Sequence, residues 1–168
     1  CFEWLTVPTD LNDANPDPAM APHVINNSWG CPTSEGCNST NFATMDTVIN
    51  NMRAAGILVV TSAGNDGSGC STVNSPPSIF EGSFAVGATA SNDVIANFSS
   101  RGPVTVFGNR TKPNISAPGV GVYSCTGSGN NPNSYTYASW NGTSMAGPHV
   151  AGVAALIMSA RPDLIGQV

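Results

Sequence analysis

A short apolar run at residues 57–61 constrains the fold of this 168-residue chain more than any other segment. Its sequence, Ile-Leu-Val-Val-Thr, is rich in β-branched side chains and too short for a helix, so we expect a strand buried on both faces. Residues 24–28 predict a second strand, and between the two the apolar residues of 41–55 recur at helical spacing until Gly56 ends the helix. This order of strand, helix and strand predicts a βαβ unit, and therefore a parallel sheet with a right-handed crossover.

The rest of the chain fits the same single domain. Residues 84–88 predict a further strand, whereas residues 90–141 alternate short extended pieces with clusters of Gly, Pro, Ser and Asn that are typical of long surface loops. Residues 1–23 include four prolines and are expected to form an irregular lead-in. No internal repeat or linker divides the sequence, so we predict one α/β domain with a mostly parallel sheet flanked by helices.

A second helix is expected from Ser144 to about Ala160. Thr143 would be its N-cap, and Pro148 comes early enough in the helix to be tolerated with a kink. Most sides of this segment carry Ala, Gly or aliphatic residues. A helix that is apolar on most sides is typical of a protein interior, so we expect this helix to be buried.

Charged side chains are rare in this chain. They make up 9% of the residues, against about 25% in an average soluble protein. A polar but uncharged surface suits a secreted protein, so we expect an extracellular location. The net charge of -5 comes without any basic cluster, which argues against nucleic acid or anionic lipid as a partner. Because no apolar stretch approaches the roughly 18 residues of a membrane span, we also expect no membrane insertion.

Five cysteines indicate one local pairing. Cys31 and Cys37 bracket a short polar loop, and a disulfide closes such a spacing easily. Cys1, Cys70 and Cys125 lie in loop or terminal contexts, and the odd total leaves at least one cysteine free or paired outside the chain. A metal site is a weaker alternative, because the sequence has no Cys-x-x-Cys motif and no Cys/His cluster.

A motif near the C-terminus resembles a known enzyme signature. Residues 142–146, Gly-Thr-Ser-Met-Ala, and residues 148–152, Pro-His-Val-Ala-Gly, are similar to the sequence around the nucleophilic serine of subtilisin-like serine proteases. Two upstream segments, Val-Ile-Asn-Asn-Ser-Trp-Gly at 24–30 and Val-Val-Thr-Ser-Ala-Gly-Asn at 59–65, resemble the substrate-binding and oxyanion-hole strands of that family. The resemblance runs from about Val24 to the end of the chain and implies a three-layer subtilisin-like fold, incomplete at its N-terminal side.

The resemblance implies a role for each residue of these motifs. Ser144 would be the nucleophile that forms the acyl-enzyme, and the Asn65 side-chain amide would donate to the oxyanion together with the Ser144 N–H. Six further residues would bind the peptide substrate: Ser28, Trp29, Gly30, Ser62, Ala63 and Gly64. Without the resemblance, Ser144 is typical of a helix N-cap, Asn65 of a turn that follows Gly64, and the others of strand ends and turns.

Two members of the expected catalytic triad have no counterpart in this sequence. The family's chain order is aspartate, histidine and serine, and both earlier motifs would lie upstream of residue 1. His149 is five residues beyond Ser144, or about 500° of helical rotation, so its side chain leaves the helix on a different side and we expect a structural role. His23, beside Pro22, is expected to lie at the start of a strand. We therefore expect a C-terminal portion of a catalytic domain that has little or no activity alone.

Two other functions are compatible with the sequence. A subtilisin-like domain that has lost catalysis would bind a peptide or a partner chain, and the residues upstream of residue 1 would distinguish it from an enzyme. An α/β-hydrolase esterase is a weaker alternative, because the sequence has no Gly-x-Ser-x-Gly motif.

The resemblance also bears on cofactors and partners. It implies no required cofactor, although related enzymes often carry a calcium-binding aspartate where this chain has Asn114. A neutral amide supplies one carbonyl oxygen and no charge, which argues against calcium there without excluding it, and we assign no metal ligand. The expected partners are a polypeptide substrate and the missing N-terminal half of the domain, and an open sheet edge would allow homodimerisation or domain swapping.

Overall fold

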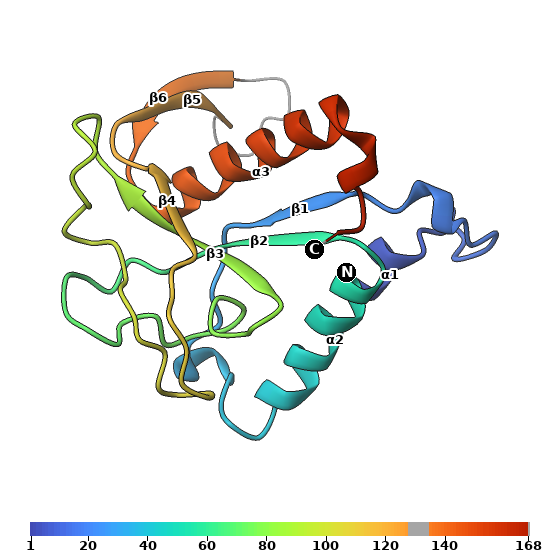
Figure 1. The fold of residues 1–168 in the computed structure, drawn as a ribbon, viewed down its shortest axis with the longest axis horizontal. Helices are drawn as coiled ribbons and strands as arrows, with labels where there is room; N and C mark the ends of the chain where they lie inside the picture. The colour runs from blue at the N-terminus through green and yellow to red at the C-terminus, as the bar shows by residue number, and fades with distance from the viewer. Residues whose placement is uncertain (128–134, 168) are drawn as a thin grey trace.

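The computed structural model describes residues 1–127 and 135–167, and its centre is a parallel β-sheet. Four strands lie side by side in chain order, β1-β2-β3-β4 (Figure 1). They are β1 Val24–Asn27, β2 Leu58–Ser62, β3 Ser83–Thr89 and β4 Ile115–Pro118. The three strands expected from the apolar runs are confirmed, each within about one residue of the expected bounds.

Helices cover both faces of this sheet (Figure 1). They are α2 Phe42–Ala54 and α3 Thr143–Ala160. Successive residues of β2 face opposite helices, because Val59 belongs to the apolar cluster that includes Ile49 of α2, whereas Val60 belongs to the cluster that includes Ala146 of α3. This alternation is the pattern of a strand buried on both faces. The predicted three-layer α/β fold is confirmed.

The register of the parallel strands aligns their carboxyl ends. Asn27 pairs with Thr61, and Thr61 pairs with Ala85. The segments that follow β1 and β2 therefore leave the sheet at one edge, and a hydrogen bond from Ser28 to Ser144 places the first turn of α3 there too. In open parallel sheets this edge is where ligands bind.

The outer side of α3 is exposed, contrary to the sequence prediction. The helix contacts all four strands of the sheet. On its other side, Val153, Leu156 and Ile157 are 55%, 72% and 50% exposed. The expectation of a fully buried helix is wrong because the sheet covers one side of α3, and no other part of the described chain covers the second.

The composition of α3 also corrects the expectation about membrane spans. The helix has 18 residues with a mean hydropathy of 1.2, which is enough by length and composition alone to cross a membrane, and 22% of it is buried. Core helices of globular domains meet the same criterion. Since one side of α3 packs against all four strands, the sheet accounts for the apolar residues on that side.

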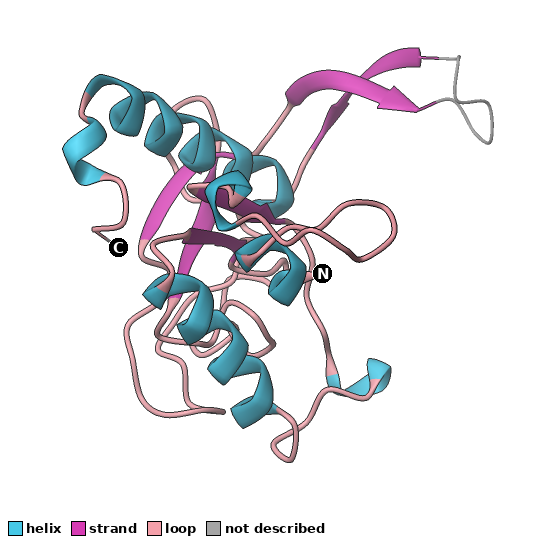
Figure 2. Cartoon of the chain, turned by 90° about the vertical axis from the view of Figure 1, so that its right-hand side faces the viewer, coloured by secondary structure: helices cyan, strands magenta, loops and turns pink. Residues whose placement is uncertain are grey.

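A two-stranded antiparallel hairpin projects from the body of the domain (Figure 2). Its strands are β5 Val122–Gly127 and β6 Tyr135–Trp140. Most of their side chains are exposed, and the rings of Tyr123 and Tyr137 stack 5.5 Å apart. The sequence predicted short extended pieces here but not their pairing, because neither strand has a buried face that would mark it.

The N-terminal lead-in is more ordered than expected. It begins with helix α1 Phe2–Thr6, which packs against α2. The Phe2 ring lies 5.9 Å from the ring of Trp29, so this helix also reaches the segment that follows β1. The rest of the lead-in is irregular, as predicted, apart from one short helical turn. The three 3-10 turns of the described chain are η1 Pro18–Met20, η2 Thr33–Glu35 and η3 Pro162–Leu164.

The predicted disulfide is present. Cys31 and Cys37 are bonded, with 5.6 Å between their Cα atoms. The bond closes the loop that contains η2, and the Cys37 Sγ atom lies 4.0 Å from the Sδ atom of Met45 in α2. It therefore ties the segment that follows β1 to the start of α2. Cys1, Cys70 and Cys125 are free and exposed.

Candidate active site

The carboxyl edge of the sheet gathers the predicted site residues. Residues 28–30 follow β1, Ser62 ends β2, and residues 63–65 follow it. Ser144 lies in the first turn of α3. Three segments that are far apart in the sequence therefore meet at one place, as the parallel topology requires.

Two reciprocal hydrogen bonds hold Ser144 against the end of β1. The Ser144 hydroxyl donates to the carbonyl oxygen of Ser28 at 3.2 Å, and the Ser28 hydroxyl donates to the carbonyl oxygen of Ser144 at 2.9 Å. Asn26 orients Ser28, because its side-chain amide donates to the Ser28 hydroxyl at 2.8 Å. The close approach of α3 needs Gly147, since a Cβ atom there would lie 2.7 Å from Asn26 Oδ1. Ser144 is thus half-buried and fixed in position.

Thr143 fixes the side chain of Asn65. The Asn65 Oδ1 atom accepts from the Thr143 N–H at 2.9 Å and from the Thr143 hydroxyl at 3.1 Å. Because the backbone N–H can only donate, the amide oxygen must face Thr143 and the Nδ2 donor must face away. The Thr143 hydroxyl also accepts from the Gly64 N–H at 3.2 Å and is fully buried. Asn65 is exposed, yet its amide is held in one orientation.

Two N–H donors converge beside Gly142. A Cβ atom on Gly142 would lie 3.7 Å from Asn65 Nδ2 and 3.6 Å from the amide nitrogen of Ser144. The Ser144 N–H is among the first four of α3, which have no partner within their helix. Both nitrogens therefore lie beside the buried backbone of Gly142, where the Met145 Sδ atom is 3.4 Å from the same Cβ position, at the positive end of the α3 dipole. Two such donors suit an anionic oxygen.

The structure corrects two interpretations based on local sequence. Thr143 is not the N-cap of α3, because Gly142 holds that position and no side chain caps the helix. Asn65 does not adopt a left-handed turn; Gly64 does, with a φ of 108°, where a Cβ atom would lie 2.8 Å from Ser100 Oγ. In both cases a contact with a distant segment decides the conformation.

The predicted substrate-binding residues differ in exposure. Trp29 is 42% exposed and lines an apolar pocket of about 410 Å³ beside α1 and α2. Gly30 lies against the loop at Ser75, where a Cβ atom would approach Ser75 Oγ to 3.2 Å. Ser62 and Ala63 are only 8% and 2% exposed, so they can offer a ligand little beyond their backbone groups. The exposed contact surface at this edge is therefore the segment that follows β1.

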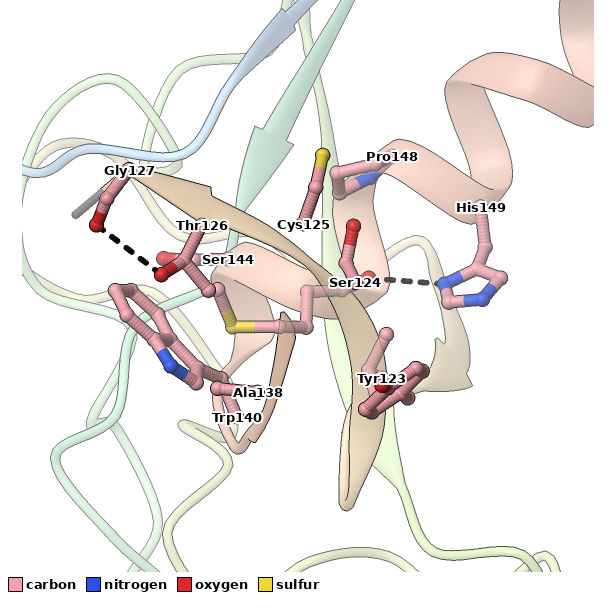
Figure 3. A pocket seen from close by; sticks show the side chains of 12 residues that line it. Tyr123, Ser124, Cys125, Thr126, Gly127, Ala138, Trp140, Ser144, Pro148 and His149 are labelled. Atoms are coloured by element: carbon pink, nitrogen blue, oxygen red, sulfur yellow. Dashed lines mark hydrogen bonds between the residues drawn. The ribbon is translucent and has the colours of Figure 1, made fainter. Parts of the chain in front are cut away.

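A larger pocket of about 530 Å³ lies between α3 and the β5–β6 hairpin (Figure 3). Ser144, Pro148 and His149 line it from α3, and Cys125 and Trp140 line it from the hairpin. Trp140 is 55% exposed, so its ring forms an open rather than a closed wall. Ser144 thus borders a cavity with room for part of a ligand.

Within the described chain, neither histidine contacts the Ser144 hydroxyl. The His149 Nδ1 atom forms a hydrogen bond with the carbonyl oxygen of Met145 at 2.9 Å, and the ring lies across the pocket from Ser144 (Figure 3). It is exposed, whereas the sequence placed it on a buried helix. His23 precedes β1, at the opposite end of that strand from Ser28. The proton of Ser144 therefore has no histidine to accept it in this arrangement.

Residues 7–167 match the profile of the subtilase family, peptidase family S8. This chain belongs to the subtilase family. The match begins within the lead-in, so the family relationship extends further towards the N-terminus than the motifs that start at Val24.

Three known proteins show how much of a subtilase is present. Bacillopeptidase F of Bacillus subtilis is 41% identical over 167 residues, which cover 96% of this chain and 10% of that protein. Subtilisin E of the same species is 39% identical over 140 residues, which cover 83% of this chain and 31% of subtilisin E. A solved protease of Pseudoalteromonas arctica superposes with a TM-score of 0.72 at 31% identity, covering 99% of this chain and 47% of its own. This chain thus spans less than half the length of each.

Thr143 and Asn26 hold candidate site residues in place, and the sequence did not predict these contacts. Thr143 holds Asn65 from 78 positions away in the sequence, and Asn26 supports a contact between Ser28 and Ser144 that spans 116 positions. Local sequence carries no signal for such contacts. The family motifs contain both residues, Thr143 next to the nucleophile candidate and Asn26 two residues before Ser28, but they assign neither contact.

The residues around Asn114 do not fit a divalent ion. Asn114 Oδ1 accepts from the Ala85 N–H and from Lys112 Nζ, both at 2.8 Å, and Lys112 Nζ also donates to the carbonyl oxygen of Ser83. Burial lowers the pKa of Lys112 to about 8, which leaves it mostly charged at neutral pH. A cation already occupies these oxygens. The described residues also contain no group of three or more His, Cys, Asp or Glu side chains that could hold a metal.

Proposed function

We propose that this chain is the serine-bearing part of a subtilase endopeptidase, in which Ser144 attacks a peptide carbonyl and forms an acyl-enzyme. The observation that carries the proposal is that Asn65 Nδ2 and the Ser144 amide nitrogen lie beside Gly142 together, 3.7 Å and 3.6 Å from the position of a Cβ atom there. The oxygen of the attacked carbonyl becomes negative in the tetrahedral intermediate, and two donors held in advance stabilise it without reorganisation. Thr143 supplies that fixed orientation for Asn65.

In this mechanism the base comes from outside the chain. A serine hydroxyl is a weak nucleophile until a base takes its proton. Neither His149 nor His23 contacts the Ser144 hydroxyl, which donates to the carbonyl oxygen of Ser28 instead. We infer that the histidine and aspartate of the triad belong to a part of the protein that precedes residue 1. The imidazole would then replace the Ser28 carbonyl as the partner of the hydroxyl.

The proposed substrate is an extended polypeptide. Residues 28–30 continue β1 at an exposed place next to Ser144, where a peptide backbone can add alongside a strand. Recognition through the backbone accepts many sequences, so this edge alone sets no strict side-chain preference. The chemistry uses the chain's own hydroxyl and amides and needs no cofactor. The scarcity of charged residues and the relationship to subtilisins favour an extracellular location.

The proposed partner of this chain is the N-terminal portion of the same domain. Two features of the described structure support it: the apolar outer side of α3 and β1 as an edge strand that pairs with β2 alone. Both lie where further strands and helices would complete the three layers. A chain of residues 1–168 on its own would instead cover these surfaces with a second copy.

A fluorophosphonate probe tests the proposed activity, because it reacts with a serine that a base has activated. We expect rapid labelling of Ser144 in the complete protein and no labelling of residues 1–168 alone. Ser144→Ala in the complete protein is the matched control and should abolish labelling. Rapid labelling of the isolated chain would reveal a base within it and refute the inferred triad. If the complete protein folds but Ser144 is not labelled, the proposed endopeptidase activity is refuted.

A non-catalytic binding domain is the second candidate. The bond from the Ser144 hydroxyl to the Ser28 carbonyl favours it, since the hydroxyl is satisfied without a base. In that case the protein would carry substituted motifs in place of the triad aspartate and histidine upstream of residue 1. It would bind peptides along residues 28–30 and leave them uncleaved.

A further inference from the structure

Lys112 carries a buried ammonium group that bridges two strands. The residue is 4% exposed, and its Nζ atom donates to the carbonyl oxygen of Ser83 and to Asn114 Oδ1. Ser83 begins β3, and Asn114 directly precedes β4, its neighbour in the sheet. A buried charge is costly unless its hydrogens find acceptors, so both bonds matter for keeping the group there. One ammonium thus joins the starts of two parallel strands.

The charges around Lys112 oppose a further cation. The Glu81 carboxylate raises the pKa of Lys112, whereas the Arg110 and Arg53 guanidinium groups lower it. Glu81 is itself 3.4 Å from Arg110, which partly neutralises it. Calcium needs about six to eight oxygen ligands, and its sites usually include carboxylates. The acceptors here are two neutral oxygens, and both already accept hydrogen bonds from Lys112.

We propose that the Lys112 ammonium is a built-in replacement for a structural metal ion, joining the starts of β3 and β4 and excluding divalent cations from the oxygens of Ser83 and Asn114. It supplies positive charge at the point where two neutral acceptors converge. A covalently attached cation cannot dissociate, so stability at this position does not depend on the metal content of the surroundings. The inference does not rest on the proposed protease activity.

Thermal unfolding of the complete protein in EDTA and in millimolar CaCl2 tests the proposal. Lys112→Met keeps the approximate length of the side chain but removes its hydrogen bonds to the Ser83 carbonyl oxygen and to Asn114 Oδ1, which retains the Ala85 N–H, so we expect the melting temperature to fall by roughly 5 to 10 °C. Arg53→Met is the matched control. Arg53 is exposed, and its substitution removes a neighbouring positive charge without changing a hydrogen bond to either oxygen. It should change the melting temperature by less than about 2 °C.

Calcium distinguishes a replaced metal site from an ordinary buried lysine. The double variant Lys112→Glu with Asn114→Asp supplies two carboxylates beside the Ser83 carbonyl oxygen, so CaCl2 should raise its melting temperature by roughly 3 to 6 °C more than that of the wild type. Calcium bound elsewhere in the protein would shift both proteins equally. The single variant Asn114→Ala should show the same change in melting temperature with CaCl2 as the wild type.

Two results would overturn the proposal. The first is a calcium response of the wild type that Asn114→Ala removes, since the metal would then bind where Lys112 is said to exclude it. The second is a Lys112→Met variant as stable as Arg53→Met. If Lys112→Met does not fold, the calcium responses of the double variant and of Asn114→Ala still decide the question.

Discussion

Thr143 determines which side-chain atom of Asn65 faces it and which lies beside Gly142. Its N–H and its hydroxyl both donate to Asn65 Oδ1, so a flipped amide would set its Nδ2 group against the N–H donor. Leaving a buried donor without an acceptor costs roughly 1 to 3 kcal/mol, which is enough to keep one orientation dominant. Thr143 therefore acts on the proposed oxyanion through Asn65 and is a positioning residue.

Substitutions at Asn65 and Thr143 should affect turnover to different degrees in the complete protein. Asn65→Ala removes one oxyanion donor, so we expect kcat to fall roughly a hundredfold to a thousandfold, the loss typical of such a deletion in a subtilisin, with KM little changed. Thr143→Val removes one of the two bonds that orient Asn65 and should lower kcat about tenfold. Steady-state kinetics on a peptide substrate measure both. A Thr143→Val enzyme with normal kcat, or with a raised KM alone, would contradict the positioning role.

At the residue scale, sequence predicts identity better than arrangement. The signature around Ser144 and the segment that ends at Asn65 single out both residues as candidates from the sequence alone. The bonds that relate them, from Thr143 to Asn65 and from Ser28 to Ser144, form only when three distant segments meet at the carboxyl edge. No local pattern encodes that meeting. For the same reason, the propensity of Thr143 to cap a helix was a poor guide to its role.

At the scale of elements, the disulfide links two parts of the candidate site. Cys31 comes two residues after Trp29, and Cys37 lies beside Met45 of α2. Trp29 and Met45 line the same apolar pocket. The bond therefore holds both walls of that pocket together while it closes the loop between β1 and α2.

Loss of the disulfide should lower stability measurably. The paired change Cys31→Ser with Cys37→Ser frees a short loop in the unfolded chain, which the chain-entropy model values at about 2 kcal/mol of the free energy of unfolding. Urea unfolding of the complete protein measures the loss. Cys125→Ser, at an exposed free cysteine, is the control and should change this free energy by less than about 0.5 kcal/mol. Equal losses in the two variants would mean that the bond contributes nothing.

The sequence predicted the elements of the sheet better than those outside it. The strands of the βαβ unit carry continuous apolar residues because the sheet is covered on both faces, and this signal is strong. The β5–β6 hairpin and α1 lack it. The hairpin exposes both faces, and α1 has no buried residue, so neither leaves a periodic apolar pattern to read.

At the scale of the whole molecule, the apolar surface is unevenly covered. One side of α3 packs on the sheet, whereas Val153, Leu156 and Ile157 on its outer side are each at least half exposed. Soluble domains rarely leave an apolar helix face open unless a partner covers it. The chain spans 31% of subtilisin E and 47% of the solved protease, so the proposed cover is the rest of the domain.

Leu156→Lys should weaken self-association of the isolated chain and destabilise the complete protein. In residues 1–168 alone, a charge at this 72% exposed position should weaken self-association, so light scattering at high concentration should show a mass closer to the monomer than for the wild type. In the complete protein the same lysine would be buried under the proposed cover and should lower the free energy of unfolding by roughly 1 to 3 kcal/mol.

Ser91→Lys, at an exposed turn, adds the same charge away from α3 and should change neither measurement. If the wild-type chain is a monomer at high concentration, its exposed helix face needs no second copy. If the complete protein tolerates Leu156→Lys as well as Ser91→Lys, the outer side of α3 faces solvent there too. That result would remove the apolar face as support for the missing half of the domain and leave the edge of β1 as the place where the two halves join.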